Sequence, residues 1–266
     1  MKNRIILYSF ILLVMLAASV VGNNTDAIDP AALIERILTV DSEQRSRIND
    51  IVFDTEFIEK NKDGTIKARF TKKTYLKYLP DTVLYHEQHL EYYKDDKLQS
   101  EKDRDNQAKE RKEKAIKRKA RNISNSMFTP FFAENADKYE ITYEGVVTEE
   151  ITGFVCHHFK VQAVEESADH INGDYYFEAE SFHLVQVDFS PAKLVRKTMF
   201  KLYELNISVT YGATAEGYWL PQQADISGRG KAMFIIGVNF ASTEYYRNPV
   251  INGGVDDEIF TGENDE

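Results

Sequence analysis

Two runs of residues in the C-terminal third of the chain place apolar side chains at every second position. The apolar members of the first run are Met199, Tyr203, Leu205, Ile207, Val209 and Tyr211, and those of the second are Ala232, Phe234, Ile236, Val238 and Phe240. Because successive side chains of a β-strand point to opposite faces, each run predicts a strand with one apolar and one polar face. An antiparallel sheet of such strands must cover its apolar face, either with another part of the chain or with a ligand.

The first 22 residues have the charge and hydropathy pattern of a secretory signal peptide. Lys2 and Arg4 precede the apolar run 5–18, and the small residues Ser19 and Gly22 follow it. This run is shorter than the roughly 20 apolar residues that span a bilayer, and polar residues come directly after it. We therefore expect a soluble, exported mature chain without a transmembrane span. It would lie in the periplasm where the cell has an outer membrane, and outside the cell otherwise.

The composition limits how the mature chain is stabilised and what it binds. Cys156 is the only cysteine, so an intramolecular disulfide is impossible and stability must come from burial. A hydrophobic content of 42% is enough for a sizeable core. The formal net charge of −10 argues against a protein that neutralises phosphates, and we expect no nucleic-acid partner.

The N-terminal part of the mature chain predicts a helix followed by a hairpin. Asp29 suits the N-cap, Pro30 suits the first helical position, and apolar residues recur at helical spacing up to Leu38. Alternating apolar residues in 51–57 and 66–70 then flank the turn signal Asp63-Gly64.

Further alternating segments follow as far as the two C-terminal runs. They lie around 83–93, 139–143, 155–161, 175–177 and 184–185. The total of roughly nine to eleven strands is more than a flat open sheet commonly carries. We therefore expect a mainly β fold with accessory helices, in which a strongly curved antiparallel sheet, or incomplete β-barrel, is covered by helices.

We expect a single domain at residues 23–255. Two segments of opposite charge differ from the rest of the chain, one within this domain and one after it. Residues 97–121 contain eleven Lys or Arg and five Asp or Glu, and their composition favours an exposed charged helix or a mobile arm. Residues 256–266 contain six acids and no base, and we expect an acidic disordered tail there.

The chain offers few patterns typical of catalysis. His86 and His89 are too close in sequence for a zinc-protease motif and would point to opposite faces of a strand. Cys156 stands beside His157 and His158 without a recognisable activating environment, so a small buried residue is the simpler interpretation. We expect no enzyme, no catalytic residue, no metal site and no cofactor.

The order of the elements resembles one known superfamily. The helix 30–38 leading into the strand 51–57, Gly153 opening a later strand, the run 175–185 and the edge 217–221 are similar to the outer-membrane lipoprotein-sorting group (LolA/LolB/RseB-like). The resemblance covers about residues 30–250. It implies an incompletely closed antiparallel barrel with helices at the open side, whose apolar concavity receives acyl chains or a lipidated partner.

On this basis we expect a non-catalytic exported carrier or binding protein for lipid, lipoprotein acyl chains or another apolar ligand, with lipid or an acylated protein as partner. The residues expected to line the concave apolar face are Phe53, Phe57, Phe70, Ile207, Val209, Phe234 and Ile236. The aromatic cluster Phe128, Phe131 and Phe132 would form either a core plug or a lid that competes with the ligand. The alternative for all ten residues is a closed core.

Two other functions stay open from the sequence. An envelope sensor or scaffold of the same fold would have a filled core and a protein partner, bound through the basic segment 97–121. An extracellular hydrolase would gather His, Asp or Glu side chains in one cleft.

Overall fold

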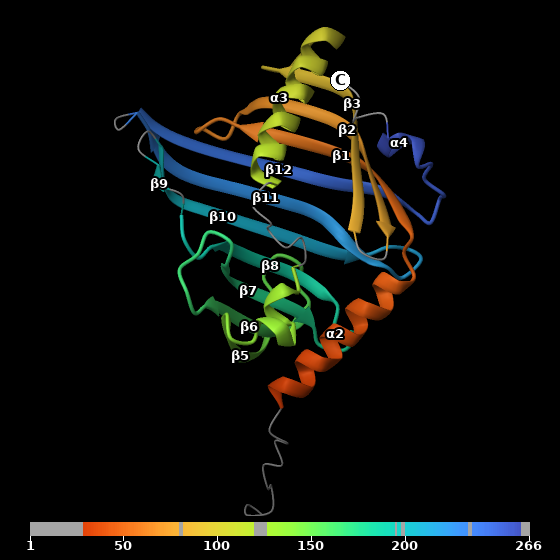
Figure 1. Ribbon diagram of the computed structural model, residues 1–266, viewed down its shortest axis with the longest axis vertical. Helices are drawn as coiled ribbons and strands as arrows, with labels where there is room; N and C mark the ends of the chain where they lie inside the picture. The colour runs from red at the N-terminus through yellow and green to blue at the C-terminus, as the bar shows by residue number, and fades with distance from the viewer. Residues whose placement is uncertain are drawn as a thin grey trace, which may run out of the picture. The chain divides into compact units, whose positions relative to one another are not determined.

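The computed structural model describes residues 29–79, 82–119, 127–194, 196–197, 200–233 and 236–261 (Figure 1). The chain divides into two compact units, residues 1–33 and 34–266. The expected signal peptide and Phe234 lie outside the described residues. At the end of the first unit, Asp29 Oδ1 accepts a hydrogen bond of 2.9 Å from the Ala31 amide, as expected of an N-cap residue.

One antiparallel sheet of twelve strands dominates the second unit, which confirms the mainly β prediction. The strands are β1 Asp50–Lys60, β2 Ile66–Leu79, β3 Thr82–Lys94, β4 Lys97–Leu98, β5 Tyr139–Thr148, β6 Val155–Ala163, β7 Ile171–Glu178, β8 Leu184–Pro191, β9 Arg196–Lys197, β10 Phe200–Ala213, β11 Trp219–Ala232 and β12 Ile236–Ile251. Their spatial order is β4-β3-β2-β1-β12-β11-β10-β8-β7-β6-β5, with β9 beside β10. Over the described residues the two end strands do not pair with each other, so the curved sheet is an incomplete barrel.

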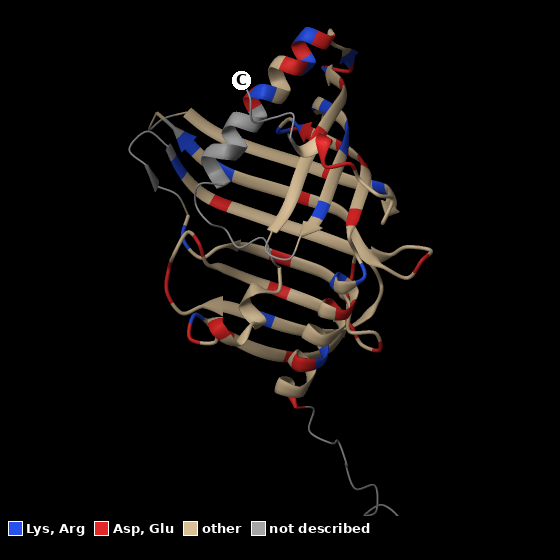
Figure 2. Cartoon of the chain, turned by 45° about the vertical axis from the view of Figure 1, so that its right-hand side comes forward, with Lys and Arg blue, Asp and Glu red and all other residues tan. Residues whose placement is uncertain are grey.

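Three helices are described, one before the first strand, one between β4 and β5, and one after the last strand. They are α2 Pro30–Ser46, α3 Glu101–Lys119 and α4 Glu258–Thr261, together with the 3-10 turns Thr129–Phe131 and Ala133–Asn135. The helix α2 continues eight residues beyond the predicted Leu38, and Ile37 and Val40 are its buried positions. The expected charged helix is α3, whose described side chains are mostly exposed and of mixed charge (Figure 2). None of the helices described has the length and apolar composition needed to cross a membrane.

In the middle of the sheet, the first strand of the sequence pairs with the last. The strand β1 pairs with β2 on one side and with β12 on the other, and Thr55 stands opposite Tyr246. The residues that follow β12 lie close to β2, since Nζ of Lys77 on β2 lies 2.6 Å from Asp257 Oδ1. The first residues of the predicted acidic tail are therefore part of the described structure.

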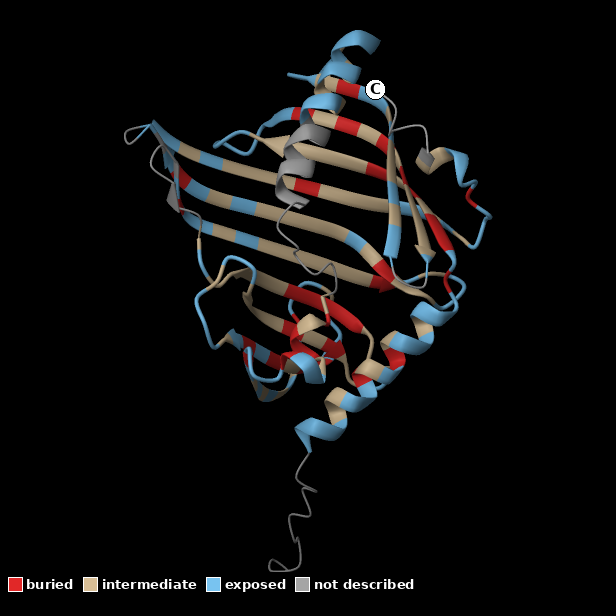
Figure 3. Cartoon of the chain, viewed as in Figure 1, coloured by how far each residue is buried: buried red, intermediate tan, exposed pale blue. Residues whose placement is uncertain are grey.

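Buried side chains are unevenly distributed over the sheet (Figure 3). One group lies on β6 to β8 and includes Phe159, Tyr175 and Phe177, each 0% exposed. Others lie on β1 and β2, where Phe53 packs with Ile48, Ile51 and Leu220, and Phe70 packs with Ala68 and Tyr92. The long strands between these groups, β10 to β12, are mostly half-buried or exposed.

Candidate functional site

One face of the sheet can be followed from strand to strand through the register; we call it the inner face. Phe131 packs on it, with its ring centroid 5.9 Å from that of Phe159 and 5.1 Å from that of Tyr175. Residues directly opposite each other on paired strands share a face. Starting from Tyr175, the register therefore places the following residues in turn on the inner face: Val187 (β8), Val209 (β10), Ala224 (β11), Glu244 (β12), Phe57 (β1) and Phe70 (β2).

The part of the inner face on β6 and β7 is filled by aromatic side chains from the 3-10 turn. Phe128 and Phe131 are 9% and 5% exposed, and their rings lie 6.0 Å and 5.6 Å from that of Phe177. The contacts of Phe131 are edge-on, which is a favourable geometry for aromatic pairs. We call Phe128 and Phe131 the aromatic plug, because they close this part of the sheet.

The part of the inner face on β10, β11, β12 and β1 is apolar but only half covered. Its half-buried apolar side chains, which we call the apolar strip, are Ile207, Val209, Ile226, Phe240 and Phe57. Gly228, opposite Phe240, leaves room for the phenyl ring, since a Cβ there would lie 2.3 Å from Phe240 Cζ. The backbone of α3 runs in front of these strands in both views (Figures 1 and 2). Because the five side chains are only half-buried, the strip retains apolar surface that a ligand can cover.

The residues expected to line a concave site fall into three groups. Phe57, Ile207 and Val209 belong to the apolar strip. Phe53 and Phe70 are each 2% exposed and lie within the core clusters of β1 and β2. Ile236 is 49% exposed at the beginning of β12, and Phe234 lies outside the described residues.

A charged cluster interrupts the inner face beside the apolar strip. Lys72 is 8% exposed, and its Nζ contacts Glu87 Oε1 on β3 and lies 2.7 Å from Glu244 Oε1 on β12. The two carboxylate side chains keep 24% and 22% of their surface exposed. We call Lys72, Glu87 and Glu244 the ionic cluster.

Hydrogen-bonding side chains surround the ionic cluster on the same face. Tyr85 donates its hydroxyl to Glu87, and Tyr246 donates to Glu244 Oε2 at 3.0 Å. His89 Nε2 lies 3.5 Å from Glu87 Oε2. Each carboxylate thereby has a hydrogen-bond partner besides Lys72, as buried charges require.

The electrostatics of the cluster keep Glu87 and Lys72 ionised. Burial acts to raise the pKa of Glu87, but the hydrogen bond from His89 and the charge and hydrogen bond of Lys72 outweigh it, so the pKa is well below the ordinary value. Burial acts to lower the pKa of Lys72, but Glu244 and Glu87 outweigh it and raise the pKa. Burial, reinforced by Glu244, raises the pKa of Tyr246, so its hydroxyl stays a proton donor.

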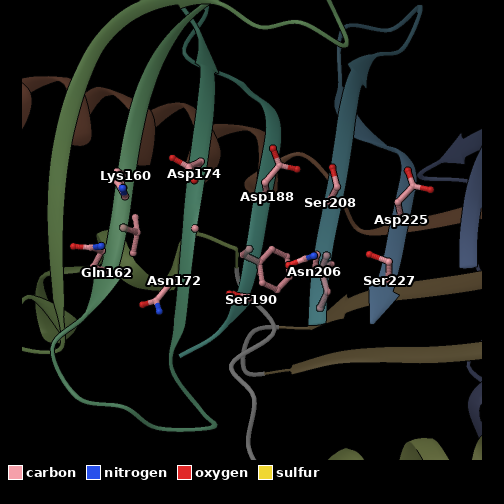
Figure 4. A pocket seen from close by; sticks show the side chains of 14 residues that line it. Lys160, Gln162, Asn172, Asp174, Asp188, Ser190, Asn206, Ser208, Asp225 and Ser227 are labelled. Atoms are coloured by element: carbon pink, nitrogen blue, oxygen red, sulfur yellow. The ribbon is translucent and has the colours of Figure 1, made fainter. Parts of the chain in front are cut away.

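The opposite, outer face carries a polar hollow of about 370 Å³ (Figure 4). Five of its lining residues stand in one cross-strand row, in the order Lys160, Asp174, Asp188, Ser208 and Asp225. Its acids are engaged locally: His158 Nε2 lies 2.8 Å from Asp174 Oδ1, and Thr243 donates to Asp225 Oδ1 at 2.6 Å. Throughout the described part of the chain no three His, Cys, Asp or Glu side chains gather as metal ligands.

The histidine and cysteine motifs lie where the alternation of strands places them. His86 stands opposite Tyr75 and His89 opposite Lys72, on different faces of β3. Cys156 is 0% exposed, and burial raises the pKa of its thiol to about 12, so it is a poor nucleophile at neutral pH.

Solved structures similar to this chain include members of the group that its sequence resembles. A protein of the DUF1329 family from Desulfovibrio piger matches with a TM-score of 0.48 at 12% identity, over 88% of this chain and 98% of that one. An outer membrane lipoprotein-sorting protein domain from Vibrio parahaemolyticus matches with a TM-score of 0.40 at 13% identity, over 85% and 97%. A LolA superfamily protein from Nitrosomonas europaea matches with a TM-score of 0.37 at 10% identity, over 88% and 98%. No protein-family model and no curated protein matches the sequence.

The ionic cluster was not predicted from the sequence. Lys72 lies two residues after Phe70 on one strand, and Glu87 and His89 lie two residues apart on the next, so all of them share the face of Phe70. Charged residues at positions that face the core could have indicated the cluster. The pairing of β12 with β1, which brings Glu244 to this place, has no local signature in the sequence.

Proposed function

We propose that this chain is a non-catalytic, exported binding protein or carrier for a lipid, a lipoprotein acyl chain or another apolar ligand of the cell envelope. The observation that carries the proposal is the half-covered apolar strip, from Phe57 to Ile207, beside a sheet region that the aromatic plug fills. A contiguous row of partly exposed apolar side chains is typical of a surface that binds another molecule.

The energetics of burial support a ligand of this class. Each methylene group moved from water onto an apolar surface contributes about 0.8 kcal/mol. Ile207 and Ile226 stand opposite each other on β10 and β11, and Phe57 lies on β1 beyond β12, so an alkyl chain laid across these four strands would contact all three. Part of one acyl chain is enough for useful affinity.

We assign the expected lining residues to this site in two roles. Phe57, Ile207 and Val209 contact the ligand, whereas Phe53 and Phe70 support the strands from the adjoining core. Ile236 extends the lining at the beginning of β12, and Phe234 is assigned there by its place in the sequence. Phe128, Phe131 and Phe132 bound the site at the filled side and act as a lid if the turn can leave the sheet.

The experiment is lipid extraction of the natively purified protein, followed by mass spectrometry and by binding of a fluorescent fatty acid. Ile207→Asp introduces a charge on the inner face and should abolish binding, while Ser208→Asp places the same charge on the outer face of the same strand and should not. Circular dichroism confirms that both variants are folded. Absence of extractable lipid together with equal binding by both variants would count decisively against the carrier.

A sensor or scaffold is the second candidate, and the aromatic plug favours it because that part of the inner face is already filled. In this case the exposed helix α3 would contact an envelope protein. Deletion of residues 97–121 should then abolish capture of that protein.

A further inference from the structure

The ionic cluster carries one more carboxylate than it has lysine. Among the residues whose side chains are described, Lys72 is the one lysine or arginine that contacts Glu87 or Glu244. Among the side chains that the structure describes here, Lys72, Glu87 and Glu244 together carry one carboxylate in excess, on a largely apolar face where an uncompensated charge is costly.

The three charged groups differ in their access to solvent. The lysine side chain is 9% exposed, whereas those of Glu87 and Glu244 are 24% and 22% exposed. The two anions are therefore more accessible than the cation to a ligand on this face. An anionic headgroup would be repelled, and a cationic one would complete the cluster.

The ionic cluster directly adjoins the apolar strip. Glu244 stands opposite Phe57 on β1 and opposite Ala224 on β11, and all three share the inner face. A molecule whose chain lies on Phe57 and Ile226 can place its polar end within reach of Glu244. The arrangement is that of a site for an amphiphile, with an apolar part and an anionic end.

We propose that the inner face selects amphiphiles with a positively charged amine headgroup, held by Glu244 and Glu87 while the alkyl chain covers the apolar strip. This inference rests on the proposed binding function and specifies its ligand class. A primary ammonium group has three donors, enough to bond both carboxylates at once. Glu244 and Glu87 are ligand-binding residues in this arrangement, and Lys72 positions them.

The test compares three probes of equal chain length at pH 8 and physiological salt: decylammonium, decanoate and decanol, each titrated calorimetrically below its aggregation concentration. Alkylammonium groups, like the lysine side chain with a pKa of about 10.4, are charged at this pH. We expect decylammonium to bind about tenfold more tightly than decanol, the contribution of one charge-assisted hydrogen bond, and decanoate to bind most weakly.

Two variants locate the selectivity. Glu244→Gln should remove most of the preference for decylammonium over decanol. Glu56→Gln is the matched control, because this glutamate has a similar side-chain exposure of 19% but pairs with Arg69 and Arg247 on the outer face. It should keep the preference. Glu87→Gln serves as a second inner-face variant if the first does not fold.

The outcomes separate the two proposals. Binding of decanol or decanoate as tight as that of decylammonium in the unmodified protein overturns the amine preference and leaves the apolar binding function standing. An equal loss of preference in Glu56→Gln attributes it to net charge and also overturns the assignment. If none of the three probes binds, the binding function itself fails.

Discussion

Lys72 Nζ lies 2.7 Å from Glu244 Oε1 although the two residues belong to strands that are not neighbours. The strand β1 runs between them, and Thr55 stands opposite Lys72 there. Thr55 is 3% exposed and its hydroxyl lies 2.9 Å from that of Thr74, so the side chain under the lysine is small and held in place. The ion pair therefore ties three strands together across the centre of the sheet.

Removing the buried cation should destabilise the fold. Lys72→Met leaves Glu87 and Glu244 close together without compensation, and we expect a loss of about 2–4 kcal/mol, below the range for fully buried pairs because the carboxylates are partly exposed. Urea denaturation measures the loss. Lys73→Met is the control, because its pair with Asp54 is solvent-exposed and should contribute less than about 1 kcal/mol. Equal effects of the two variants would contradict the central role of Lys72.

The same cluster predicts a loss of stability in acid. The folded-state pKa of Glu87 is depressed, so its contribution is present above the unfolded-state pKa and is lost as the pH falls. Unfolding free energy should therefore decrease below about pH 4.5, near the ordinary glutamate value, and the decrease should be shallower in Glu87→Gln. The exposed Glu216, changed to Gln, provides the comparison and should leave the acid limb of the curve unaltered.

Truncating the aromatic plug should show how firmly it is bound to the sheet. Phe131 contacts Phe159, Tyr175 and Phe177, and Phe131→Ala should cost about 3–5 kcal/mol by the usual cost of a large core truncation. Phe132 is half-buried, and its replacement by alanine should cost less. A loss below about 1 kcal/mol for Phe131→Ala, measured by chemical denaturation, would instead favour a turn that leaves the sheet readily.

The single thiol should be protected in the folded protein. Cys156 is fully buried and its pKa is raised to about 12, so thiolate is scarce near neutral pH. Iodoacetamide at pH 8 should leave the native protein unmodified and should alkylate it completely in denaturant, as intact-mass measurement would show. Rapid labelling of the folded protein would reveal an opening of β6 that the structure does not show.

The alternation of apolar residues was sufficient to predict a mainly β architecture, because the apolar and polar faces of each strand appear as alternate positions in its own sequence. The hairpin at Asp63-Gly64 and the strands around Tyr175 and Leu184 are present as expected, and the count of twelve includes two strands of two residues each. The helix α2 was predicted too short because polar residues interrupt its apolar pattern after Leu38.

The candidate site was less predictable, because burial depends on partners far away in the chain. Phe53 and Phe57 have the same pattern in the sequence, yet Leu220 and Ile48 cover the first, and the second remains half open. The ionic cluster depends on three strands whose order the sequence does not state, so alternation alone could not assemble it.

The pairing of β1 with β12 also bears on when the chain can fold. Residues such as Thr55 and Tyr246 are almost two hundred positions apart, and contacts of such long range form slowly. The central seam of the sheet cannot close until the last strand has left the ribosome. A nascent chain with this topology therefore remains without its central β1–β12 pairing until its synthesis is nearly complete.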